Sequence, residues 1–590
     1  MRYTNHHHHH PRLLYFTRNY RLQWVLCVMF VGDILDIRVV RAWEFNSTFP
    51  LRSIIPIYFS TAMPLLLLKT LSYLCGFVIS WYSLTVAVRL TITLLGLITD
   101  YSVMKLAGWV GGRDAVSAAV VMATSYISLV YYSRTFSNTV ESFLYAALLY
   151  FITRKSHKRI YDIPYAVVIS MLIVVGVFNR PTFVVYAVVP YLWWLFSDGV
   201  DRVIVKSVNS VVTAVPVSIL LIICDSIYFG HLDINNLDVA DLSDIMSFLS
   251  HNITVTPLNF VLYNTQSGNL AEHGIHPRFT HFVVNIPLLF SVLSVCFFYD
   301  VLWWCMTVVW GRTWKVVSTY RRHLMLLGCC VVPVTLLSMF PHQEPRFLIP
   351  LLPVFMALYA DKITSAGGML ALWVVANLLG CLFYGCVHQA GVVPCLGYLQ
   401  QTQPVALDRH VIFWHTYTAP QHLLLLPQQY SGSQDPDHNG NSPVHAGNSP
   451  VTTHSGNSPV HTGNSLKSLE GNSVGDLIHH LTRINSSQSS QRWGKPEVMV
   501  AAPSSEHHYL VCKAAEAGIR LDISWSFWPH LSTEHPPNLD DIVCRVKASR
   551  CRTITDDNVD SDDDNDFCNR ALIDRIRFLT ALNLYRVTFL

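Results

Sequence analysis

Long apolar segments recur through the first two thirds of this chain and constrain its fold more than any other feature. A helix needs about 20 mostly apolar residues to cross the hydrocarbon core of a bilayer. The candidate spans are residues 54–79, 84–108, 114–132, 139–153, 163–178, 182–197, 207–229, 281–305, 323–340, 347–361 and 368–386. A further run, 22–31, is too short to cross alone. Several spans are short or contain proline, which is typical of tilted, re-entrant or deeply packed helices. The sequence therefore predicts an all-α polytopic membrane protein.

The composition indicates that lipid supplies part of the solvent for this chain. Hydrophobic residues make up 51% of the 590 residues and charged residues only 13%, whereas a soluble domain carries about 25% charged residues. The net charge of +3 gives no reason to expect a nucleic-acid partner. The 14 cysteines show no metal-ligand spacing, and we interpret most of them as packing residues. Disulfides stay open for the cysteines of the polar tail, which are Cys512, Cys544, Cys551 and Cys568.

Basic loops set the orientation, because loops rich in Lys and Arg stay in the cytosol. Residues 154–159 and 312–322 are such loops, and the four spans between them make the two assignments agree. The same count places 179–181, 230–280 and the loop at His342 in the lumen, where the sequon Asn252-Ile253-Thr254 can be glycosylated. The tail from about 388 is luminal too, with a sequon at Asn485. Upstream of 154 the parity does not close if the sequon at Asn46 is luminal.

The chain divides by composition into five regions. They are a cytosolic N-terminal segment 1–21, a multi-span region 22–398, a luminal extension 399–435, a repeat 436–470 and a luminal C-terminal region 471–590 with an acidic tail. The repeat is rich in Gly, Asn, Ser and Pro, so it cannot bury enough apolar area to fold and is expected to be disordered. Apolar patterning around 500–535 predicts a small folded luminal unit. The histidines 6–10 and the acidic run 556–566 are given no function.

Charged and amide side chains beside the spans are the functional candidates, because charge is costly at membrane depth. They are Arg134 and Asn138 in the stretch 133–139, Asn179 and Arg180 in the turn 178–182, Asp225 at the luminal end of its span, and His342, Glu344 and Arg346 in the stretch 342–350. Arg180 has a structural alternative as a helix cap or a snorkelling side chain. Asp225 has one too, as a residue that only holds two helices together.

The stretch at His342 favours a phosphate-bearing substrate. An arginine gives bidentate hydrogen bonds to phosphate, a histidine can donate a proton, and the glutamate between them can orient either one. This reasoning indicates catalysis on a lipid-linked substrate at the luminal interface. A lipid or ion transporter using the same charges remains an alternative, although we find no internal repeat of the kind that transporters show.

The residues 342–347, His-Gln-Glu-Pro-Arg-Phe, resemble the His-(Lys/Gln)-Glu-x-Arg-Phe signature of mannosyltransferases that use dolichyl-phosphate mannose. Gln343 is typical of one branch of glycosyltransferase family 22, the GPI mannosyltransferase 4 family. The likeness covers most of 30–425. Further matching stretches are 43–46, 134–139, 178–183, 225–229, 256–264, 280–281, 388–391, 415–417 and 529–531.

The resemblance implies a GT-C type helical bundle in the endoplasmic reticulum membrane. The implied donor is dolichyl-phosphate mannose, and the implied acceptor is a GPI glycolipid intermediate bearing three mannoses. The new bond is an α-1,2 linkage formed with inversion. The leaving phosphate needs charge stabilisation rather than protonation, which suits Arg346 and His342, with Arg134 or Arg180 as further candidates. No metal and no cofactor is expected.

One departure from the family concerns the catalytic base. The family's first luminal loop carries a His-Pro-Asp-Glu stretch, and its acid is the expected base. Here residues 28–36 lack that stretch, and Asp33, Asp36 and Glu44 are the acids that remain in the loop. Asp33 and Asp36 are therefore weak candidates for the base. The alternative is a catalytically impaired family member that only binds lipid-linked substrate.

Overall fold

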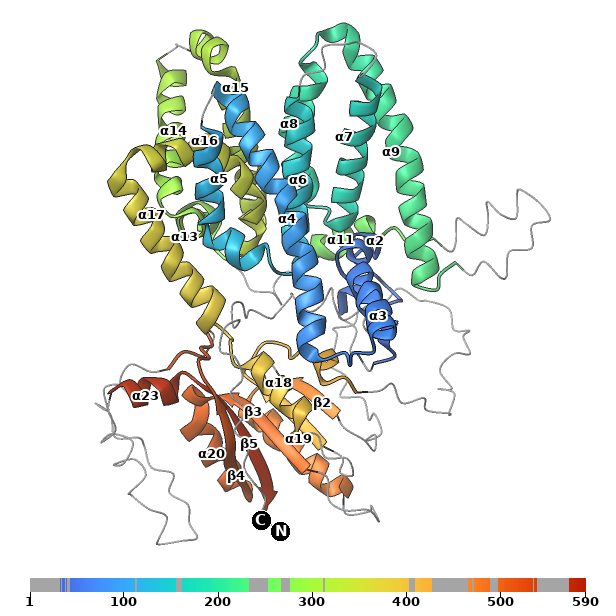
Figure 1. The fold of residues 1–590 in the computed structure, drawn as a ribbon, viewed down its shortest axis with the longest axis vertical. Coiled ribbons are helices and arrows are strands. Elements are labelled where there is room, and N and C mark those ends of the chain that lie inside the picture. Colours follow the sequence, from blue (N-terminus) through green and yellow to red (C-terminus); the bar gives the residue numbers. More distant parts are fainter. Residues whose placement is uncertain are drawn as a thin grey trace, which may run out of the picture. The chain divides into compact units, whose positions relative to one another are not determined.

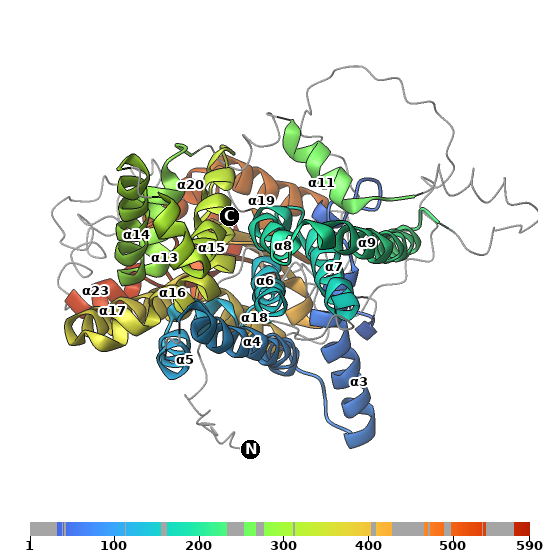
Figure 2. The same cartoon turned by 90° about the horizontal axis from the view of Figure 1, so that it is seen from above.

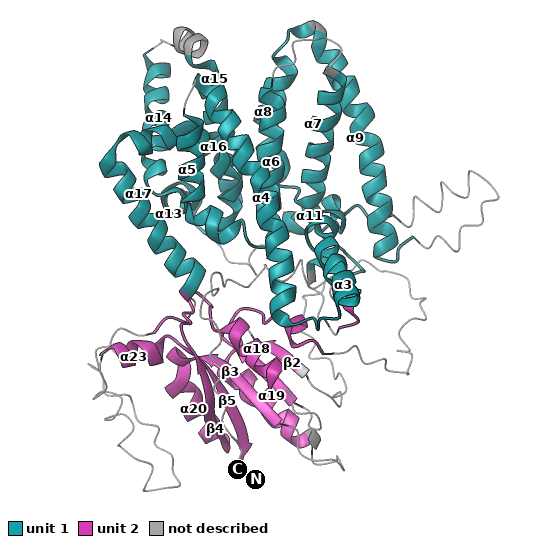
Figure 3. Ribbon diagram, in the orientation of Figure 1, with its two compact units in different colours: residues 1–34, 40–386 teal, residues 35–39, 387–590 magenta. Residues whose placement is uncertain are grey.

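The computed structural model describes residues 32, 34–37, 39, 43–111, 114–154, 162–232, 253–266, 276–310, 313–402, 409–426, 465–469, 472–488, 497–533, 535–537 and 572–590. They form two compact units (Figure 3). The first unit comprises residues up to 34 and 40–386, and the second comprises 35–39 and 387–590. The second unit thus begins at residue 387, before residue 398, at which the multi-span region was expected to end. The apolar run 22–31, the histidines 6–10 and the acidic run 556–566 lie outside the described residues.

The first unit is helical, and most of its helices overlap the predicted spans, whereas α11 lies in the stretch 230–280 that was expected to be a luminal loop. They are α2 (Ile55–Ile57), α3 (Met63–Cys75), α4 (Trp81–Gly111), α5 (Ala115–Ala123), α6 (Ser137–Thr153), α7 (Asp162–Asn179), α8 (Phe183–Phe196), α9 (Val200–Tyr228), α11 (Thr256–Thr265), α13 (Ile286–Phe290), α14 (Val292–Val309), α15 (Thr313–Ser338), α16 (Leu352–Ser365) and α17 (Gly367–Gly380). Short helical turns join them: η1 (Trp43–Phe45), η2 (Tyr58–Ala62), η3 (Ile127–Tyr131), η6 (His281–Asn285), η7 (Pro345–Leu351) and η8 (Cys381–Val387). Among the described residues, 7 helical runs are long and apolar enough to cross a membrane. The predicted multi-span helical class is confirmed.

Burial separates lipid-facing helices from the central one. In the run Arg202–Tyr228 only 22% of the apolar window is buried, and in Gly367–Val387 only 17%. Such apolar surfaces would be a liability in water but are expected in lipid. In the run Pro345–Ser365, 78% of the apolar window is buried, so α16 is surrounded by protein. A helix in this position is apolar on all sides. Phe355 of α16 stacks on Phe290 of α13 with 4.1 Å between ring centroids.

The direction of α3 bears on the upstream parity, because the run Ile55–Cys75, which contains α3, is one of the 7 candidate spans. Seen from above in Figure 2, α3 lies lengthwise at the side of the bundle, whereas α7, α8 and α9 are viewed much closer to end-on. In Figure 1 it lies beside the end of α4 at which that helix begins. A helix in this direction fits the membrane interface, where its exposed Leu67 and Leu74 would contact lipid. If α3 lies along the interface and does not cross, the upstream count loses one crossing, and Asn46 and residue 154 take the sides expected from the sequence.

The second unit contains a five-stranded sheet that the sequence analysis did not predict. Its strands are β1 (Arg409–Trp414), β2 (Ser465–Leu469), β3 (Glu497–Pro503), β4 (Ile519–Phe527) and β5 (Leu582–Phe589), in the order β2-β1-β3-β5-β4. β1 is parallel to β2 and β3, and β5 is antiparallel to β3 and β4. All six residues of β1 are buried, as expected for a central strand covered on both faces.

Helices cover this sheet. α19 (Val474–Gln488) and α20 (His507–Glu516) contribute Leu481 and Leu510 to one core that also contains Val500 and Tyr585. α18 (Val392–Gln401) places Tyr398 in a stack on Trp525 of β4, with 5.4 Å between ring centroids. α18 therefore belongs to this unit, which is why the division lies before it. The last helix is α23 (Leu572–Leu579).

Two expectations for the tail are refined by the structure. The expected disordered segment 436–470 ends too late, because Ser465–Leu469 forms β2 and buries Leu466 and Leu469. These residues follow the repeat and supply the apolar side chains that the repeat lacks; residues 427–464 lie outside the described residues. Cys512 is disulfide-bonded, which suits the oxidising lumen. The other tail cysteines, Cys544, Cys551 and Cys568, lie outside the described residues.

Candidate active site

Three arginine–glutamate ion pairs come from segments that are far apart in the sequence of the helical unit. The pairs are Arg52–Glu44 with 3.1 Å between nitrogen and oxygen, Arg180–Glu141 at 3.6 Å, and Arg346–Glu344 at 2.5 Å. Burial alone would raise the pKa of Glu44, but Arg52 lowers it, and the charges of Arg180 and Arg346 lower it further. The three pairs therefore form one electrostatic cluster, which we call the Arg–Glu cluster.

The α7–α8 turn positions Arg180. The Arg180 N–H donates to the Gly176 carbonyl at 2.9 Å, and the Phe183 N–H donates to the Arg180 carbonyl at 2.9 Å, so the backbone reverses between the two helices. The guanidinium donates from Nη1 to Ser137 Oγ at 3.0 Å and to Asn138 Oδ1 at 3.5 Å. Burial, together with the nearby charge of Arg52, lowers the pKa of Arg180 to about 10. The side chain thus remains a cation at neutral pH.

Glu141 is the buried counter-charge of Arg180. Its side chain is 1% exposed, and a buried charge is tolerated only when it is paired and hydrogen-bonded. Thr182 Oγ1 donates to Glu141 Oε1 at 3.0 Å, and Asn138 Nδ2 donates to Oε2 at 3.4 Å. Asn138 thus contacts both charges of the pair. Asn179 lies beside it and donates from Nδ2 to the Ser137 carbonyl at 3.0 Å, which fixes the start of α6.

The loop before η7 brings His342, Glu344 and Arg346 together. Arg346 Nη2 donates to Glu344 Oε1 at 2.6 Å, and His342 Nε2 lies 2.8 Å from the same oxygen. Burial alone would raise the pKa of Glu344, but Arg346 and His342 bring it down to about 2. Glu344 is therefore a carboxylate at all physiological pH values. It orients the arginine and the histidine and cannot donate a proton itself.

Phe347 joins two of the ion pairs. The guanidinium carbon of Arg180 lies 5.4 Å from the centre of the Phe347 ring, and that of Arg346 lies 5.8 Å from it. The His342 ring packs against the same phenyl ring edge-on at 5.5 Å. A cation within about 6 Å of an aromatic face is attracted by the ring quadrupole. One aromatic ring therefore fixes the relative positions of two cations and a histidine.

Gln343 connects this loop to η6. It is 1% exposed, and its Oε1 accepts from the His281 N–H at 3.0 Å. Its Nε2 donates to the carbonyls of Ser338 at 3.0 Å and Phe340 at 3.1 Å. A side chain at this position must therefore both donate and accept, as an amide does. Because Gln343 points into the protein, its neighbours His342 and Glu344 are held toward the cluster.

Asp225 is completely buried and serves as a tether in the described residues. Its Oδ1 accepts from Ser53 Oγ at 2.9 Å and from the Ile54 N–H at 3.0 Å, while Oδ2 accepts from Thr256 Oγ1 at 2.9 Å. It thereby joins the end of α9 to the loop that carries Arg52 and to the start of α11. Figure 1 shows α2 and α11 near the same end of α7. Its partners among the described residues are a backbone amide and two hydroxyls, and these contacts favour the interpretation of Asp225 as a residue that holds helices together.

The contacts of the Arg–Glu cluster given above do not include the remaining sequence candidates. Arg134 is completely buried, donates from Nη2 to the Tyr384 carbonyl at 2.8 Å, and lies over the Tyr131 ring, so it connects the turn before α6 to η8. Asp36 is exposed and belongs to the second unit. Asp33 lies outside the described residues. The structure thus brings together six of the ten named candidates: Asn138, Asn179, Arg180, His342, Glu344 and Arg346.

Sequence reasoning missed several contributors to the cluster. Arg52, Gln343 and Glu141 were not proposed as site residues, and Glu44 was noted only as one of the acids that remain in the first loop. Arg52 lies two residues after Pro50 and just before an apolar span, which is the kind of signal that marked the other candidates. Its pairing with Glu44 depends on the fold of the first loop, where the Leu51 N–H donates to the Glu44 carbonyl at 2.9 Å.

The chemistry open to this cluster is the binding and stabilisation of an anion. Guanidinium groups bind phosphate through charge-assisted hydrogen bonds. Each carboxylate of the cluster is already paired with a guanidinium, which disfavours it as a metal ligand. Among the described residues, a group of three metal-ligating side chains lies elsewhere, in the second unit, at His415, Glu506 and His535.

Several known proteins are similar to this chain. The profile of the Alg9-like mannosyltransferase family matches residues 10–426. The chain is 34% identical over 433 residues to the human GPI alpha-1,2-mannosyltransferase 4, covering 67% of this chain and 70% of that protein. It is 26% identical over 597 residues to GPI mannosyltransferase 4 of Drosophila melanogaster, covering 86% and 82%. Among solved structures, ArnT from Cupriavidus metallidurans bound to undecaprenyl phosphate has a TM-score of 0.46 at 10% identity, covering 86% of this chain and 92% of that one.

The family profile covers well over half of the chain and includes all three ion pairs of the cluster. The chain therefore belongs to the Alg9-like mannosyltransferase family.

Proposed function

We propose that this protein is the α-1,2-mannosyltransferase that adds the fourth mannose to the GPI precursor at the luminal face of the endoplasmic reticulum membrane. The observation that carries the proposal is the Arg–Glu cluster around Phe347, in a family member whose relatives are named GPI mannosyltransferase 4. The proposed donor is dolichyl-phosphate mannose, and the proposed acceptor is the GPI glycolipid that bears three mannoses. Both are lipid-linked, which suits a site at the end of membrane helices.

The reaction exchanges one bond at the anomeric carbon for another. The bond between this carbon and the donor phosphate oxygen breaks, and a bond to the 2-hydroxyl oxygen of the third mannose forms on the opposite face. Dolichyl phosphate leaves with the electron pair, so negative charge grows on the phosphate in the transition state. Preorganised donors aimed at such a charge stabilise it most. We assign this role to Arg346 and Arg180, with His342 as a further donor.

The acceptor hydroxyl must lose its proton to a base. Glu344 is a poor base because Arg346 and His342 hold its pKa at about 2. Glu141 is almost fully enclosed by Arg180, Thr182 and Asn138. Glu44 is 14% exposed and lies on the first loop, downstream of residues 28–36, which lack the family's acidic stretch. We therefore assign the base role to Glu44 in place of Asp33 and Asp36; Asp36 is an exposed residue of the second unit, and Asp33 lies outside the described residues.

The alternative of a chain that only binds lipid-linked substrate is not favoured. Its basis was the missing His-Pro-Asp-Glu stretch. The cluster retains a carboxylate on the first loop, and the curated relatives described above are named as mannosyltransferases. An impaired binder would still require the arginines but not Glu44, so Glu44 distinguishes the two functions.

The test is complementation in cells that lack the fourth-mannose step. The chain is expressed there, its membrane insertion is verified, and GPI intermediates are analysed by mass spectrometry. We expect a four-mannose species from the natural chain and from Arg520→Ala, which alters an exposed ion pair of the second unit. Glu44→Gln should lower the yield by about 10²- to 10⁴-fold, the usual contribution of a general base. A well-inserted natural chain that forms no four-mannose species would overturn the proposed function, and full activity of Glu44→Gln would overturn the base assignment.

A further inference from the structure

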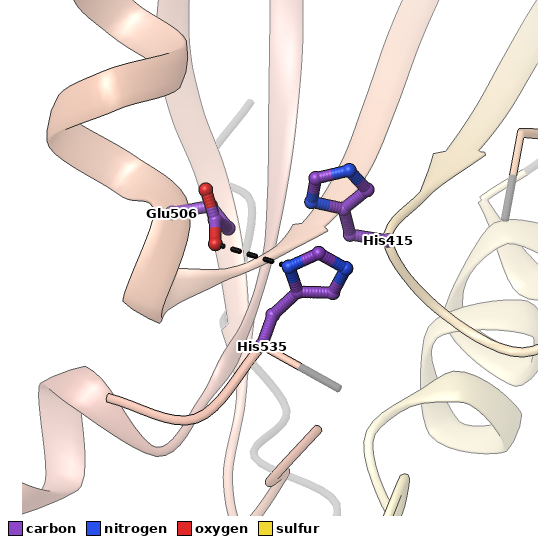
Figure 4. Close-up of side chains that lie close together, drawn as sticks. All are labelled: His415, Glu506 and His535. Carbon is purple, nitrogen blue, oxygen red and sulfur yellow. Dashed lines mark ion pairs between the residues drawn. The ribbon is translucent and has the colours of Figure 1, made fainter. Parts of the chain in front are cut away.

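The strand directions of the second unit bring three metal-ligating side chains to one edge of its sheet. β1 and β3 are parallel neighbours, and β4 runs in the same direction because both β3 and β4 are antiparallel to β5. His415 follows the end of β1, Glu506 ends the turn η11 (Ser504–Glu506) after β3, and His535 follows β4. The carboxyl ends of strands that run in one direction meet at the same edge, where ligands of α/β sheets commonly bind. Figure 4 shows the three side chains converging there.

The distances between the ligand atoms fit one ion. One nitrogen or oxygen from each of the three side chains lies within 4.8 Å of the other two. His535 Nδ1 and Glu506 Oε1 are 3.3 Å apart. Two ligands on a tetrahedral zinc ion, with bonds of about 2.0–2.1 Å, are separated by about 3.4 Å. This pair already has a separation near that value, and a rotation of the His535 ring out of its stack on His415 lets all three ligands face one ion.

His415 has the hydrogen-bonding pattern of a metal ligand. Its Nε2 lies 3.2 Å from the Asn472 carbonyl oxygen, to which it can donate a proton. Its Nδ1 is buried and has no hydrogen-bond partner among the described residues. Metal-bound histidines usually donate their other ring N–H to a carbonyl or carboxylate, which fixes the tautomer and leaves the free nitrogen for the ion. Trp414 supports the ring by stacking on it at 3.6 Å.

We propose that His415, Glu506 and His535 bind one divalent transition-metal ion, of which zinc is the best match. Two imidazoles and one carboxylate form a known zinc ligand set that leaves a fourth position for water. The ion ties the ends of β1 and β4 to the start of α20. The sequence analysis expected no metal, because the three ligands lie on separate segments with no short spacing between them. This site is independent of the Arg–Glu cluster and of the proposed function.

The two imidazole rings indicate how binding proceeds. His415 and His535 are stacked, with 3.6 Å between ring centroids and an angle of 7° between planes. Ring-nitrogen lone pairs lie in the ring plane, so two parallel rings cannot both aim at one ion. His535 is the ring that turns, because His415 is held by Asn472 and Trp414. Loss of the stack on loading is therefore part of the proposal.

The test measures zinc in the purified full-length chain. Because a run of five histidines could take up metal by itself, the reference chain carries alanine at positions 6–10. It is stripped with a chelator, loaded with zinc alone, desalted, and analysed by elemental mass spectrometry. We expect stoichiometric zinc in the reference chain and a higher unfolding temperature with zinc than with chelator. His415→Ala, His535→Ala and the milder Glu506→Gln should each lose the zinc and the temperature shift.

The matched control is His508→Ala, which removes an exposed histidine two residues after Glu506 and should retain both effects. X-ray absorption of the loaded reference chain should show only nitrogen and oxygen ligands, with histidine scattering. Since Glu506→Gln keeps the side-chain shape, it separates loss of a ligand from loss of folding. Absence of zinc from a folded reference chain would overturn the proposal, as would equal zinc in the reference chain and all three ligand variants.

Discussion

Arg180 and Arg346 lie over the same aromatic ring, with guanidinium carbons 5.4 and 5.8 Å from the centre of Phe347. Each cation has its own glutamate, Glu141 for Arg180 and Glu344 for Arg346. The two glutamates compensate the repulsion between the arginines, so the pair can stay charged in a partly buried site. A phosphate that leaves from a lipid carrier meets two fixed cations, and neither has to reorganise as charge develops.

Arg346→Lys tests whether the fork of the guanidinium matters in addition to its charge. Lysine keeps the cation but offers a point charge in place of planar bidentate donors. We expect mannose transfer by detergent-purified protein to fall by about 10²- to 10³-fold, as for the loss of one oxyanion donor. The decrease should be in kcat more than in KM for the donor lipid. Arg520→Lys, in the exposed Arg520–Asp522 pair, is the matched control and should keep normal rates.

Glu141→Ala should destabilise the protein strongly, because it leaves Arg180 buried without its counter-charge. Removing one partner of a buried ion pair costs about 3–5 kcal/mol. Thermal unfolding in detergent should show a large decrease in midpoint. Lys513→Ala breaks the exposed Lys513–Glu516 pair, for which little change in the unfolding midpoint is expected. Equal midpoints for the two variants would show that the Arg180–Glu141 pair is not buried in the protein as it exists.

Glu344 should make the stability of the folded protein depend on pH, and the sign of this dependence follows from the lowered pKa of its carboxyl group. Its pKa is about 2 in the folded protein, below the ordinary value of 4.5, with Arg346 and His342 outweighing burial. Glu344 therefore contributes stability that is fully present above pH 4.5 and is lost as the pH falls from 4.5 through 2. The difference in unfolding midpoint between the natural chain and Glu344→Gln should be constant at neutral pH and shrink below pH 4.5. A difference that grows on acidification would contradict the assignment.

Gln343 should tolerate neither of its two obvious replacements. Gln343→Lys can still donate to the carbonyls of Ser338 and Phe340, but it cannot accept from the His281 N–H. Gln343→Glu can accept from His281 but faces the carbonyls with a negative charge. Each change leaves a buried polar group unsatisfied, which costs about 1–3 kcal/mol. We expect both variants to unfold at lower temperature, and Gln343→Lys to lose activity as well, because the loop then no longer holds His342 and Glu344. Normal stability of both would show that the amide is not buried.

The sequence predicted the membrane helices and the charged positions of the site better than it predicted which side chains pair with one another. Apolar length placed the spans, and the cost of charge in lipid singled out Arg180, Glu344 and Arg346 as candidates. The pairing of Arg52 with Glu44 depends on the first loop, and no periodicity predicts it. The orientation of α3 was missed for a physical reason, because an apolar segment of that length looks the same whether it crosses the membrane or lies along it. The ligands His415, Glu506 and His535 meet only through the strand directions of a sheet that the sequence did not reveal.

Two variants of Asp225 distinguish a residue that only holds helices together from one that binds the substrate. In Asp225→Asn the Oδ1 atom can still accept from Ser53 and from the Ile54 N–H, and the new amide can donate to the Thr256 hydroxyl, which can also accept. Activity and unfolding midpoint should therefore stay close to those of the natural chain. Asp225→Ala leaves these buried donors unsatisfied, at about 1–3 kcal/mol each, and should lower both the midpoint and the activity. If Asp225 instead contacted the substrate through its charge, Asp225→Asn would abolish transfer while the unfolding midpoint remained unchanged.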